Sequence, residues 1–414
     1  MREARASGPA WSKGGSMIFR QLLLLPSIIL IASLAGCPGG PPGAWTPLER
    51  GEYREGTGTR LDEAKRTEPR GYDVEDGFLT YWGDGVSLVD IERGKRLTLS
   101  GNPACGNAAV SGGSVGFLCW SPKPSVEGFY VPEVHVYSIS NGVSMSIAHA
   151  ENLPGIESMR EAALCRQAFV VRARVHGQRR NGLWSVDTTN GKARRLSLEN
   201  EDVGGFSCRG DTLFYYSVGS SGNLLLVDLS SGQRRSVSLG ASAAPRNLRT
   251  DGQTAVFEDL RDDAFHGGNV EAFHSSIYRH EVSSGLTERV GDNSSIQLSP
   301  DVGSGWIVWQ DFRNSARPNY LGSKDQVDIY GRKTGARADT RLSQLSGFAF
   351  DPRIGHDMLL YRWRPPGEEN AGIFAKNLKT ITTKKLAAVL SSVLPSVIRR
   401  RDDAAFSKDI HHAF

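Results

Sequence analysis

The sequence predicts an all-β protein built as a β-propeller, with seven blades favoured and six or eight as the alternatives. Two observations lead to this fold. The chain contains 47 glycines, which favours many tight turns and therefore β-structure. One pattern, an apolar strand followed by a glycine turn and a polar strand, recurs at intervals of 41 to 53 residues. A repeat of this length that holds about four short strands is typical of a propeller blade.

Residues 1–36 are predicted to be a secretory signal peptide. An uncharged apolar run occupies residues 22–36 and follows Arg20. This run is shorter than the roughly 20 apolar residues that a transmembrane helix needs, and it has the order of a basic residue, an apolar core and small residues. Met17 stands where a signal peptide of ordinary length would begin, so we expect it to be the initiator.

Residues 34–37 have the sequence LAGC, which resembles the lipobox of bacterial lipoproteins. The resemblance implies cleavage before Cys37, a diacylglycerol on its sulfur, and a lipid anchor in a membrane. Residues 37–72 then form the lipidated cysteine, a Pro/Gly tether and a lead-in segment. Because Pro38 is not the aspartate that favours inner-membrane retention in enterobacterial lipoproteins, we expect the outer membrane, in its periplasmic or its surface leaflet.

The propeller is predicted to span residues 73–386. Its turn glycines stand at positions 94, 142, 191, 232, 285 and 335, and a degenerate seventh copy of the pattern lies at 373–380. Two further strands precede each copy. A four-stranded sheet cannot bury both faces alone, but sheets stacked around an axis can. The predicted blades are 73–100, 104–149, 160–199, 204–240, 245–291, 295–343 and 346–386.

The joint between the first and last blades must be closed, because an open sheet edge invites unwanted pairing. A strand from residues 45–72 or from 387–400 would close it, and the sequence leaves both choices open. For the C-terminal segment, 387–414, a short helix is the alternative to a closing strand. Helical spacing supports that alternative at Leu386, Leu390, Leu394 and Ile398.

Two segments carry a family resemblance. Residues 307–314 (IVWQDFRN) and 328–331 (DIYG) resemble the repeat of TolB-like propellers, as does LSPD at 298–301. The resemblance is strongest over residues 245–335. It implies a WD40-like β-propeller fold and a protein-binding role in the cell envelope. TolB itself has a small α/β domain before its propeller, and residues 38–72 are too short and too polar for that domain, so we expect no role in the Tol system.

Charge and missing motifs exclude several functions. The chain has 49 basic and 45 acidic residues, and residues 1–36 hold four of the former and one of the latter. The nearly neutral remainder argues against nucleic acid as a partner. The sequence lacks a G-x-S-x-G motif and a phosphate-binding glycine loop, so we predict no catalytic residue and no cofactor. His266 and His274, with Asp262 and Asp263, are interpreted as solvated loop residues, and no metal site is predicted.

Four cysteines remain after Cys37. An even number of cysteines in an oxidising envelope favours disulfides. Two of them flank a Ser-Gly-Gly-Ser turn, and the other two occupy matching positions in adjacent blades. The sequence therefore favours two pairs over the other two pairings and over four buried thiols. The favoured pairs are Cys105 with Cys119 and Cys165 with Cys208.

An Asp-x-Arg pair occurs twice, as Asp259/Arg261 and as Asp311/Arg313. Spacing i, i+2 puts both side chains of a pair on one strand face. Because the pair recurs with the repeat, we interpret it as a structural ion pair or turn contact and not as a binding site.

Long connections between second and third strands are predicted at 121–133, 259–275, 311–327 and 363–371. These connections emerge on one face of a propeller, and loops on a rigid scaffold commonly carry binding sites. Aromatic residues beside arginine are typical interface anchors. The alternative is that the loops fold over their own blades. The predicted binding face comprises Phe129, Tyr130, Phe265, Phe273, Phe312, Arg317, Tyr320, Trp363 and Arg364.

The sequence thus predicts a non-catalytic envelope lipoprotein that binds an envelope protein, a peptide or a glycan through the loop-rich face of its propeller. The alternative is a polymer-acting enzyme, a lyase or hydrolase, with its site in the propeller funnel. That alternative requires carboxylates, histidines or metal ligands that converge in the funnel. A funnel lined by serine, glycine and aliphatic residues would discard it. A third interpretation is a purely structural surface protein.

Overall fold

The computed structural model describes residues 44–47 and 70–385, apart from 125–129, 149–155, 176, 219–222, 241, 263–274, 293, 317, 319–325, 344–345, 368–370 and 380–381. Within these ranges all regular secondary structure is β-strand. No membrane-spanning helix is found in this part of the chain. The predicted signal peptide, the lipid-acceptor cysteine and the C-terminal segment lie outside the described residues.

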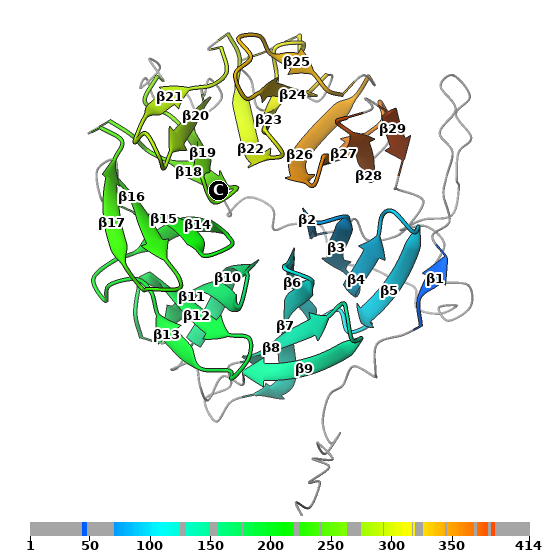
Figure 1. The fold of residues 1–414 in the computed structure, drawn as a ribbon, viewed down its shortest axis with the longest axis vertical. Helices are drawn as coiled ribbons and strands as arrows, with labels where there is room; N and C mark the ends of the chain where they lie inside the picture. Colours follow the sequence, from blue (N-terminus) through cyan, green and yellow to red (C-terminus); the bar gives the residue numbers. More distant parts are fainter. Residues whose placement is uncertain are drawn as a thin grey trace, which may run out of the picture. The chain divides into compact units, whose positions relative to one another are not determined.

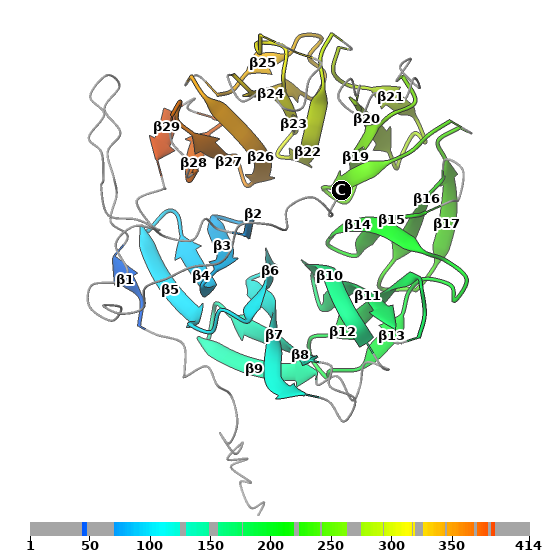
Figure 2. The same cartoon turned by 180° about the vertical axis from the view of Figure 1, so that it is seen from behind.

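Seven antiparallel sheets, each made of four consecutive strands, form a ring (Figures 1 and 2). We number these sheets as blades 1 to 7 in chain order. The first strand of each blade lies nearest the centre and the fourth lies at the rim. Blades 1 to 3 consist of β2 (Gly71–Glu75), β3 (Phe78–Gly83), β4 (Gly85–Asp90), β5 (Lys95–Ser100); β6 (Cys105–Ser111), β7 (Ser114–Pro124), β8 (Tyr130–Ser138), β9 (Val143–Ala148); and β10 (Ile156–Cys165), β11 (Ala168–Val175), β12 (Asn181–Asp187), β13 (Ala193–Arg195).

The remaining four blades repeat the same order of strands, so the prediction of a seven-bladed propeller is confirmed. They consist of β14 (Val203–Arg209), β15 (Thr212–Ser217), β16 (Asn223–Asp228), β17 (Arg234–Ser238); β18 (Arg246–Thr250), β19 (Thr254–Asp259), β20 (Ser276–Glu281), β21 (Thr287–Arg289); β22 (Gln297–Gly303), β23 (Trp306–Asp311), β24 (Asp328–Lys333), β25 (Thr340–Arg341); and β26 (Phe348–Gly355), β27 (Met358–Arg364), β28 (Gly372–Asn377), β29 (Thr382–Lys385).

The turn glycines behave as the repeat predicts. All six join the third strand of a blade to its fourth. Their φ angles lie between 61° and 81°, in the left-handed region that costs glycine little and other residues more. The six glycines are therefore the points where the sequence specifies a hairpin, and the observed blades begin and end within four residues of the predicted bounds.

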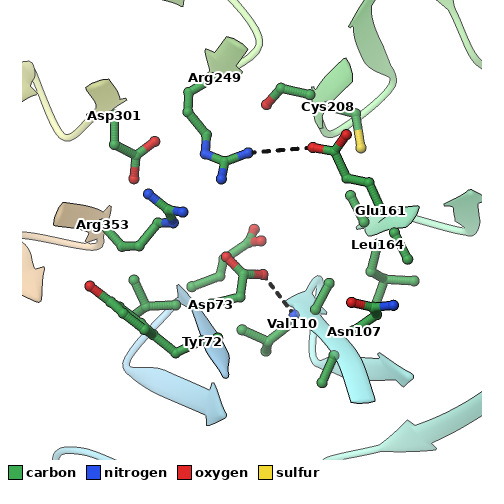
Figure 3. A pocket seen from close by; sticks show the side chains of 18 of the residues that line it. Tyr72, Asp73, Asn107, Val110, Glu161, Leu164, Cys208, Arg249, Asp301 and Arg353 are labelled. Atoms are coloured by element: carbon green, nitrogen blue, oxygen red, sulfur yellow. Dashed lines mark hydrogen bonds and ion pairs between the residues drawn. The ribbon is translucent and has the colours of Figure 1, made fainter. Parts of the chain in front are cut away.

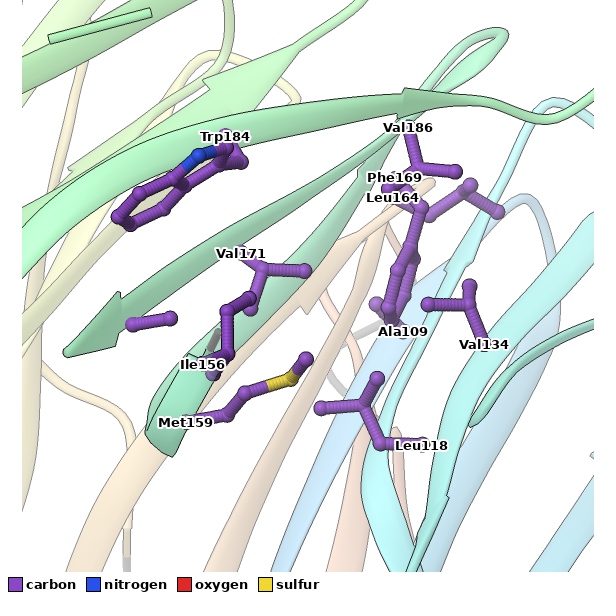
Figure 4. Packing of buried hydrophobic residues seen from close by; sticks show 11 residues of the cluster. Ala109, Leu118, Val134, Ile156, Met159, Leu164, Phe169, Val171, Trp184 and Val186 are labelled. Atoms are coloured by element: carbon purple, nitrogen blue, oxygen red, sulfur yellow. The ribbon is translucent and has the colours of Figure 1, made fainter. Parts of the chain in front are cut away.

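The core lies between the blades and not within them. Figure 4 shows the cluster between blades 2 and 3, where Leu118 of β7 and Phe169 of β11 pack in the same apolar layer. Both side chains are fully buried, and burying a side chain of this size contributes about 1.5–3 kcal/mol. Gly116 permits the close approach, because a Cβ atom there would lie 2.5 Å from Cδ2 of Phe169. Side chains between adjacent sheets thus hold the ring together.

In the described residues the first and last blades meet without an exchanged strand, and most of the residues predicted to supply a closing strand, 48–69 and 387–400, lie outside the described residues. Blade 7 completes its own sheet with β29, and β2 of blade 1 packs beside β26 of blade 7. Tyr72 donates a hydrogen bond to the carbonyl oxygen of Asp351 across this joint. Apolar side chains from both blades, among them Val74 and Leu360, share one buried cluster. The joint is therefore closed by the same side-chain packing as the other joints.

A two-residue strand, β1 (Thr46–Pro47), pairs antiparallel with the outer strand β5 of blade 1. Thr46 lies opposite Arg96, and Pro47 lies opposite Lys95. Blade 1 consequently has five strands. The part of the predicted closing segment that the structure describes therefore extends the rim of blade 1 and does not enter blade 7.

The connections between second and third strands are long in the blades where the sequence predicts them. They span residues 260–275, 312–327 and 365–371 in blades 5, 6 and 7. In blade 2 most of the predicted insertion is strand, because β7 runs on to Pro124 and β8 starts at Tyr130. Strands alternate in direction within a blade, so all of these connections leave the same face of the ring.

Candidate functional site

A cavity of about 300 Å³ lies on the axis of the ring. The first strands of all seven blades line it, and charged side chains point into it from several sides (Figure 3). Most of its lining residues come from the C-terminal halves of these strands. Those halves lead to the short first turns of the blades, on the face opposite the long connections.

One structurally equivalent position per blade forms a layer around the cavity. In each blade this residue lies two positions before the pair that closes the first hairpin, as Asp301 lies before the pair of Gly303 and Trp306. In blade 5 the closing pair is Asp251 and Thr254, which share a backbone hydrogen bond. We call this layer the inner ring. Its members in blades 1 to 7 are Asp73, Ala109, Ala163, Ser207, Arg249, Asp301 and Arg353.

The inner ring has two unlike halves. Blades 5, 6, 7 and 1 contribute, in this order around the axis, Arg249, Asp301, Arg353 and Asp73, so the charges alternate. Blades 2, 3 and 4 contribute only two alanines and a serine. We call the first set the charged arc and the second set the small arc. All seven residues line the cavity.

The two aspartates of the charged arc make the same contact with the next blade. Asp73 accepts a hydrogen bond from the backbone N–H of Val110 at 3.0 Å, and Asp301 accepts one from the N–H of Ile354 at 2.7 Å. Val110 and Ile354 both directly follow an inner-ring residue. This repetition indicates that each carboxylate joins two neighbouring blades.

Ion pairs also cross the cavity. Arg209 of blade 4 lies 3.2 Å from Glu75 of blade 1. Glu161 of blade 3 lies 3.3 Å from Arg172 of the same blade and 4.0 Å from Arg249 of blade 5. Arg249 and Glu161 point toward each other in Figure 3. Arg209 and Arg249 thus offset carboxylates of other blades, and Arg172 offsets one in its own blade.

Burial raises the pKa values of three carboxyls in the cavity. Burial raises the pKa of Glu75 to about 7, although Arg209 opposes the shift. Burial also raises the pKa values of Glu161 and Asp301, against the effect of nearby arginines. The Arg353 guanidinium, together with burial, lowers the pKa of Arg249. The cavity therefore holds charge that is only partly solvated, and protonation of a carboxyl there is easier than in water.

A β-bulge places the inner-ring residue in four blades. Asn107, Asn247, Ser299 and Asp351 each open such a bulge and have φ angles between 45° and 55°. Such a conformation is uncommon for residues other than glycine. Glu258 stabilises two neighbouring bulges, because it accepts hydrogen bonds from Asn247 Nδ2 at 2.6 Å and from the N–H of Ser299 at 2.5 Å.

Two residues of the predicted binding face have buried side chains. Phe312 is 1% exposed and Trp363 is 4% exposed. Phe312 packs with Ile296 and meets Phe348 edge-on. Trp363 packs against Phe374 and donates a hydrogen bond from its Nε1 to the carbonyl oxygen of Ser346 at 3.1 Å. Aromatic side chains next to a strand end here fill the space around the blade, and the sequence does not distinguish them from exposed ones.

The other predicted binding residues are partly exposed or undescribed. Arg364 is half-buried, with its guanidinium 5.0 Å from the ring centre of Phe348. Tyr130 is the first residue of β8. The remaining five lie outside the described residues, namely Phe129, Phe265, Phe273, Arg317 and Tyr320.

The structure contains both disulfides that the sequence favours. Cys105 is bonded to Cys119 within blade 2. Cys165 is bonded to Cys208, and this bond joins β10 of blade 3 to β14 of blade 4. The second disulfide therefore ties two blades of the small arc.

The Asp-x-Arg pairs form local contacts away from the cavity. Asp259 accepts hydrogen bonds from the backbone N–H and the guanidinium of Arg261, and Asp311 does the same for Arg313. Each guanidinium also lies over a tyrosine of the third strand in its blade, 4.3 Å and 4.1 Å from the ring centres. This agrees with the interpretation as a repeated structural contact. Among the described residues there is no group of three or more side chains that would bind a metal.

The inner ring is the feature that sequence reasoning missed. Each member stands three positions before the first residue of a two-residue turn, as Asp73 does before Asp76-Gly77 and Asp301 before Ser304-Gly305. The repeats of the predicted blades are aligned on the glycines between third and fourth strands. Alignment on the turns between first and second strands would have shown the alternating charges. The bulges conceal this pattern, because they shift the inward positions out of a strict period of two.

Neither a protein-family model nor a curated protein matches the chain. Solved structures do match. The β-propeller domain of the Trilobed protease from Pyrococcus furiosus, described as having an open velcro topology, is 8% identical, with a TM-score of 0.56 over 80% of this chain and 99% of that domain. Oligogalacturonate lyase from Vibrio parahaemolyticus is 13% identical, with a TM-score of 0.53 over 80% of this chain and 97% of the lyase.

Acylaminoacyl peptidase from Pyrococcus horikoshii is 9% identical, with a TM-score of 0.55 over 78% of this chain. The chain spans only about half of that peptidase, 52% of its length. At such identities the likeness shows the fold alone. It supports the β-propeller that the TolB-like repeats imply.

Proposed function

We propose that this chain is a non-catalytic binding module of the cell envelope, held in the outer membrane by a lipid on Cys37. Its partner, an envelope protein, a peptide or a glycan, binds on the face that carries the long connections. One observation carries the proposal. Three consecutive blades, 5 to 7, place their longest connections on the same face. On the opposite face the first turns of blades 6 and 7 have two residues each, and such turns offer little surface for a partner.

The contacts in the cavity support a scaffold more than a reaction centre. Asp73 and Asp301 are engaged by backbone N–H groups of the next blade. Glu75 and Glu161 face arginines. Carboxylates bound in this way join blades, whereas a general acid or base must be free to reach a substrate.

The test is capture of a partner after cross-linking in membranes. One variant has residues 263–274 replaced by a short Gly-Ser linker. The matched control carries the same linker between Ser230 and Ser231, in a turn on the opposite face. We expect the wild-type chain and the control to recover the same stoichiometric partner, and the loop variant to lose it. Equal recovery of the partner by the loop variant would show that the partner binds at another part of the surface. Failure of all three chains to recover a stoichiometric partner would overturn the binding function.

The membrane anchor has a separate test. Replacing Cys37 by serine removes the sulfur that would carry the lipid, so we expect the protein to leave the membrane fraction or to accumulate as its precursor. Incorporation of a labelled fatty acid should be lost at the same time. Unchanged processing and unchanged membrane retention would contradict the anchor.

A polymer-acting enzyme, a lyase or a hydrolase, is the second candidate, and one observation favours it. The funnel is not lined by serine, glycine and aliphatic residues alone, and Glu75 in it has a pKa of about 7, which suits a general acid or base. Purified protein should be assayed on pools of peptides and oligosaccharides beside the Glu75→Gln variant. Activity that the substitution abolishes without loss of folding would replace the binding proposal. Equal absence of turnover in both proteins would remove this candidate.

A further inference from the structure

We propose that two copies of this chain pair through the outer strand of blade 2, β9, to form a two-fold symmetric dimer. The proposal goes beyond the binding function above, because it concerns the rim of the ring and not its loop-rich face. Except for β5, which pairs with β1, the fourth strands end their blades and present a backbone edge that no described strand covers. Proteins commonly protect such edges with charged side chains.

Six of the seven fourth strands in the described chain carry that protection. β9 has the sequence VSMSIA, with neither a charge nor a proline. It is the exception among edge strands that otherwise carry at least one basic residue. The basic side chains of the other six are Lys95 and Arg96 in β5, Arg194 and Arg195 in β13, Arg234 and Arg235 in β17, Arg289 in β21, Arg341 in β25, and Lys384 and Lys385 in β29.

β9 is also exposed and apolar on one face. Val143 keeps 46% of its surface exposed and Met145 keeps 52%, so both belong to the few large apolar residues that are exposed in the described chain. Alternation places Val143 and Met145 on the same face of the strand, and β9 bulges at Ile147 in its pairing with β8. Ile147 packs against the apolar cluster between blades 2 and 3, so the exposed face continues a buried one.

The molecule already shows that a rim strand can accept another strand. β1 pairs antiparallel with β5, on the outer edge of the neighbouring blade. Figures 1 and 2 both show it outside that blade. Strand addition at an outer edge is thus compatible with the curvature of this ring.

The sequence of β9 is suited to pair with itself. In an antiparallel pair, residues directly opposite each other point to the same side of the sheet. A two-fold axis at Met145 puts Met145 opposite its own copy and Ser144 opposite Ser146, within the regular part of β9 before its bulge at Ile147. The Val143 and Met145 side chains of both strands then share one face, and the serines share the other. A shift by one residue would mix them.

Charge selects a second copy over other occupants. The same two-fold pairing at a rim strand such as β17 would bring the exposed Arg235 near its own copy, and like charges close to each other across a strand pair are destabilising. An acidic peptide would prefer those basic edges. β9 has no charge to attract such a peptide and none to repel its own copy, and closed two-fold dimers are the commonest symmetric assembly.

Oxidative cross-linking of Met145→Cys tests the register. Cβ atoms of directly opposite residues lie about 4.5–5.5 Å apart, near the separation that a disulfide spans. Membranes that contain the full-length variant are treated with copper phenanthroline and run on a non-reducing gel. Ser236→Cys is the matched control, because Ser236 is an exposed residue of the rim strand β17. We expect a shift from monomer to dimer mass for Met145→Cys and none for the control.

A second variant adds the protection that the other rim strands have. The double substitution Ser144→Lys and Ser146→Lys should convert detergent-solubilised protein from dimer to monomer mass in light scattering, with an unchanged thermal midpoint as the check on folding. Dimer yield from Met145→Cys no higher than from the control, or wild-type protein of monomer mass, would overturn the proposal. Cross-linking of Met145→Cys to a different protein would also overturn the proposal, because β9 would then pair with a strand of that protein and not with a second copy of this chain.

Discussion

The charged arc and the small arc occupy equivalent positions of one repeat, yet different contacts hold them. In blades 5, 6, 7 and 1 the inner ring supplies two arginines and two aspartates, and the aspartates bond to the next blade. In blades 2, 3 and 4 it supplies alanine, alanine and serine, and a disulfide joins Cys165 to Cys208 between two of these blades. The difference teaches that the repeat specifies the hairpins, while each joint between blades has its own chemistry.

Removal of a charge from the charged arc should have the largest effect. Arg353→Met keeps most of the side-chain volume but removes the cation that lies 2.8 Å from Asp351, and it leaves Asp301 with Arg249 alone. Breaking a buried charge pair in this way costs about 3–5 kcal/mol of unfolding free energy. Denaturation in urea measures the loss.

Ser207→Ala is the matched control for this substitution, because Ser207 occupies the same inner-ring position in the small arc. We expect a loss below about 1 kcal/mol there. A similarly small loss for Arg353→Met would show that water in the cavity already compensates the charges, and the contrast between the arcs would not hold.

Removal of the disulfide between blades 3 and 4 should have the next largest effect. Cys165 and Cys208 are 43 residues apart in sequence, whereas Cys105 and Cys119 are 14 apart. Cross-links that close longer loops restrict the unfolded chain more, and a typical contribution is about 2–4 kcal/mol. We expect the Cys165→Ala/Cys208→Ala protein to lose about 1 kcal/mol more than the Cys105→Ala/Cys119→Ala protein. The reverse order of stabilities would argue against a special role of this disulfide in the small arc.

Protonation of Glu75 should give the smallest of these effects. The pKa of this carboxyl is about 7 in the folded chain against 4.5 in its ordinary state. The folded state holds the proton more tightly than the unfolded state. The contribution of Glu75 to the unfolding free energy is therefore greatest below pH 4.5 and is lost as pH rises through 7. The total change is at most about 3 kcal/mol.

Glu75→Gln should therefore flatten the dependence of unfolding free energy on pH between pH 4.5 and pH 7, and should make the protein more stable than wild type at pH 8. Glu199→Gln, at an exposed position outside the cavity, serves as the control and should leave the profile unchanged. If the unfolding free energies of the Glu75→Gln and wild-type proteins change with pH in parallel, a group other than Glu75 causes the pH dependence.

The fold could be predicted because its local signals agree. Glycines such as Gly94 and Gly232 mark hairpins, and the apolar strands between them have no other way to bury both faces. The binding face could not be predicted to the same degree. Phe312 and Trp363 lie next to strand ends. At such positions the sequence pattern is the same for a buried aromatic side chain as for an exposed one. Whether their side chains fill a core depends on the neighbouring strand or blade, which is a tertiary property.

The inner ring escaped prediction for a different reason. Bulges at Asn247 and Ser299 change which residues face the cavity, so strict alternation along a strand fails there. The cysteine pairing, in contrast, followed from matching positions in adjacent blades, because the repeat converts sequence position into spatial position.

Hydrogen exchange of the first strands tests the central contrast most directly. In the Cys165→Ala/Cys208→Ala protein we predict that β10 and β14 lose protection, while β22 and β26, which are joined through Asp301 and Ile354, keep the protection of the wild-type chain. Equal loss in all four strands, or no loss in β10 and β14, would contradict the account that each arc of the ring is held by its own kind of contact.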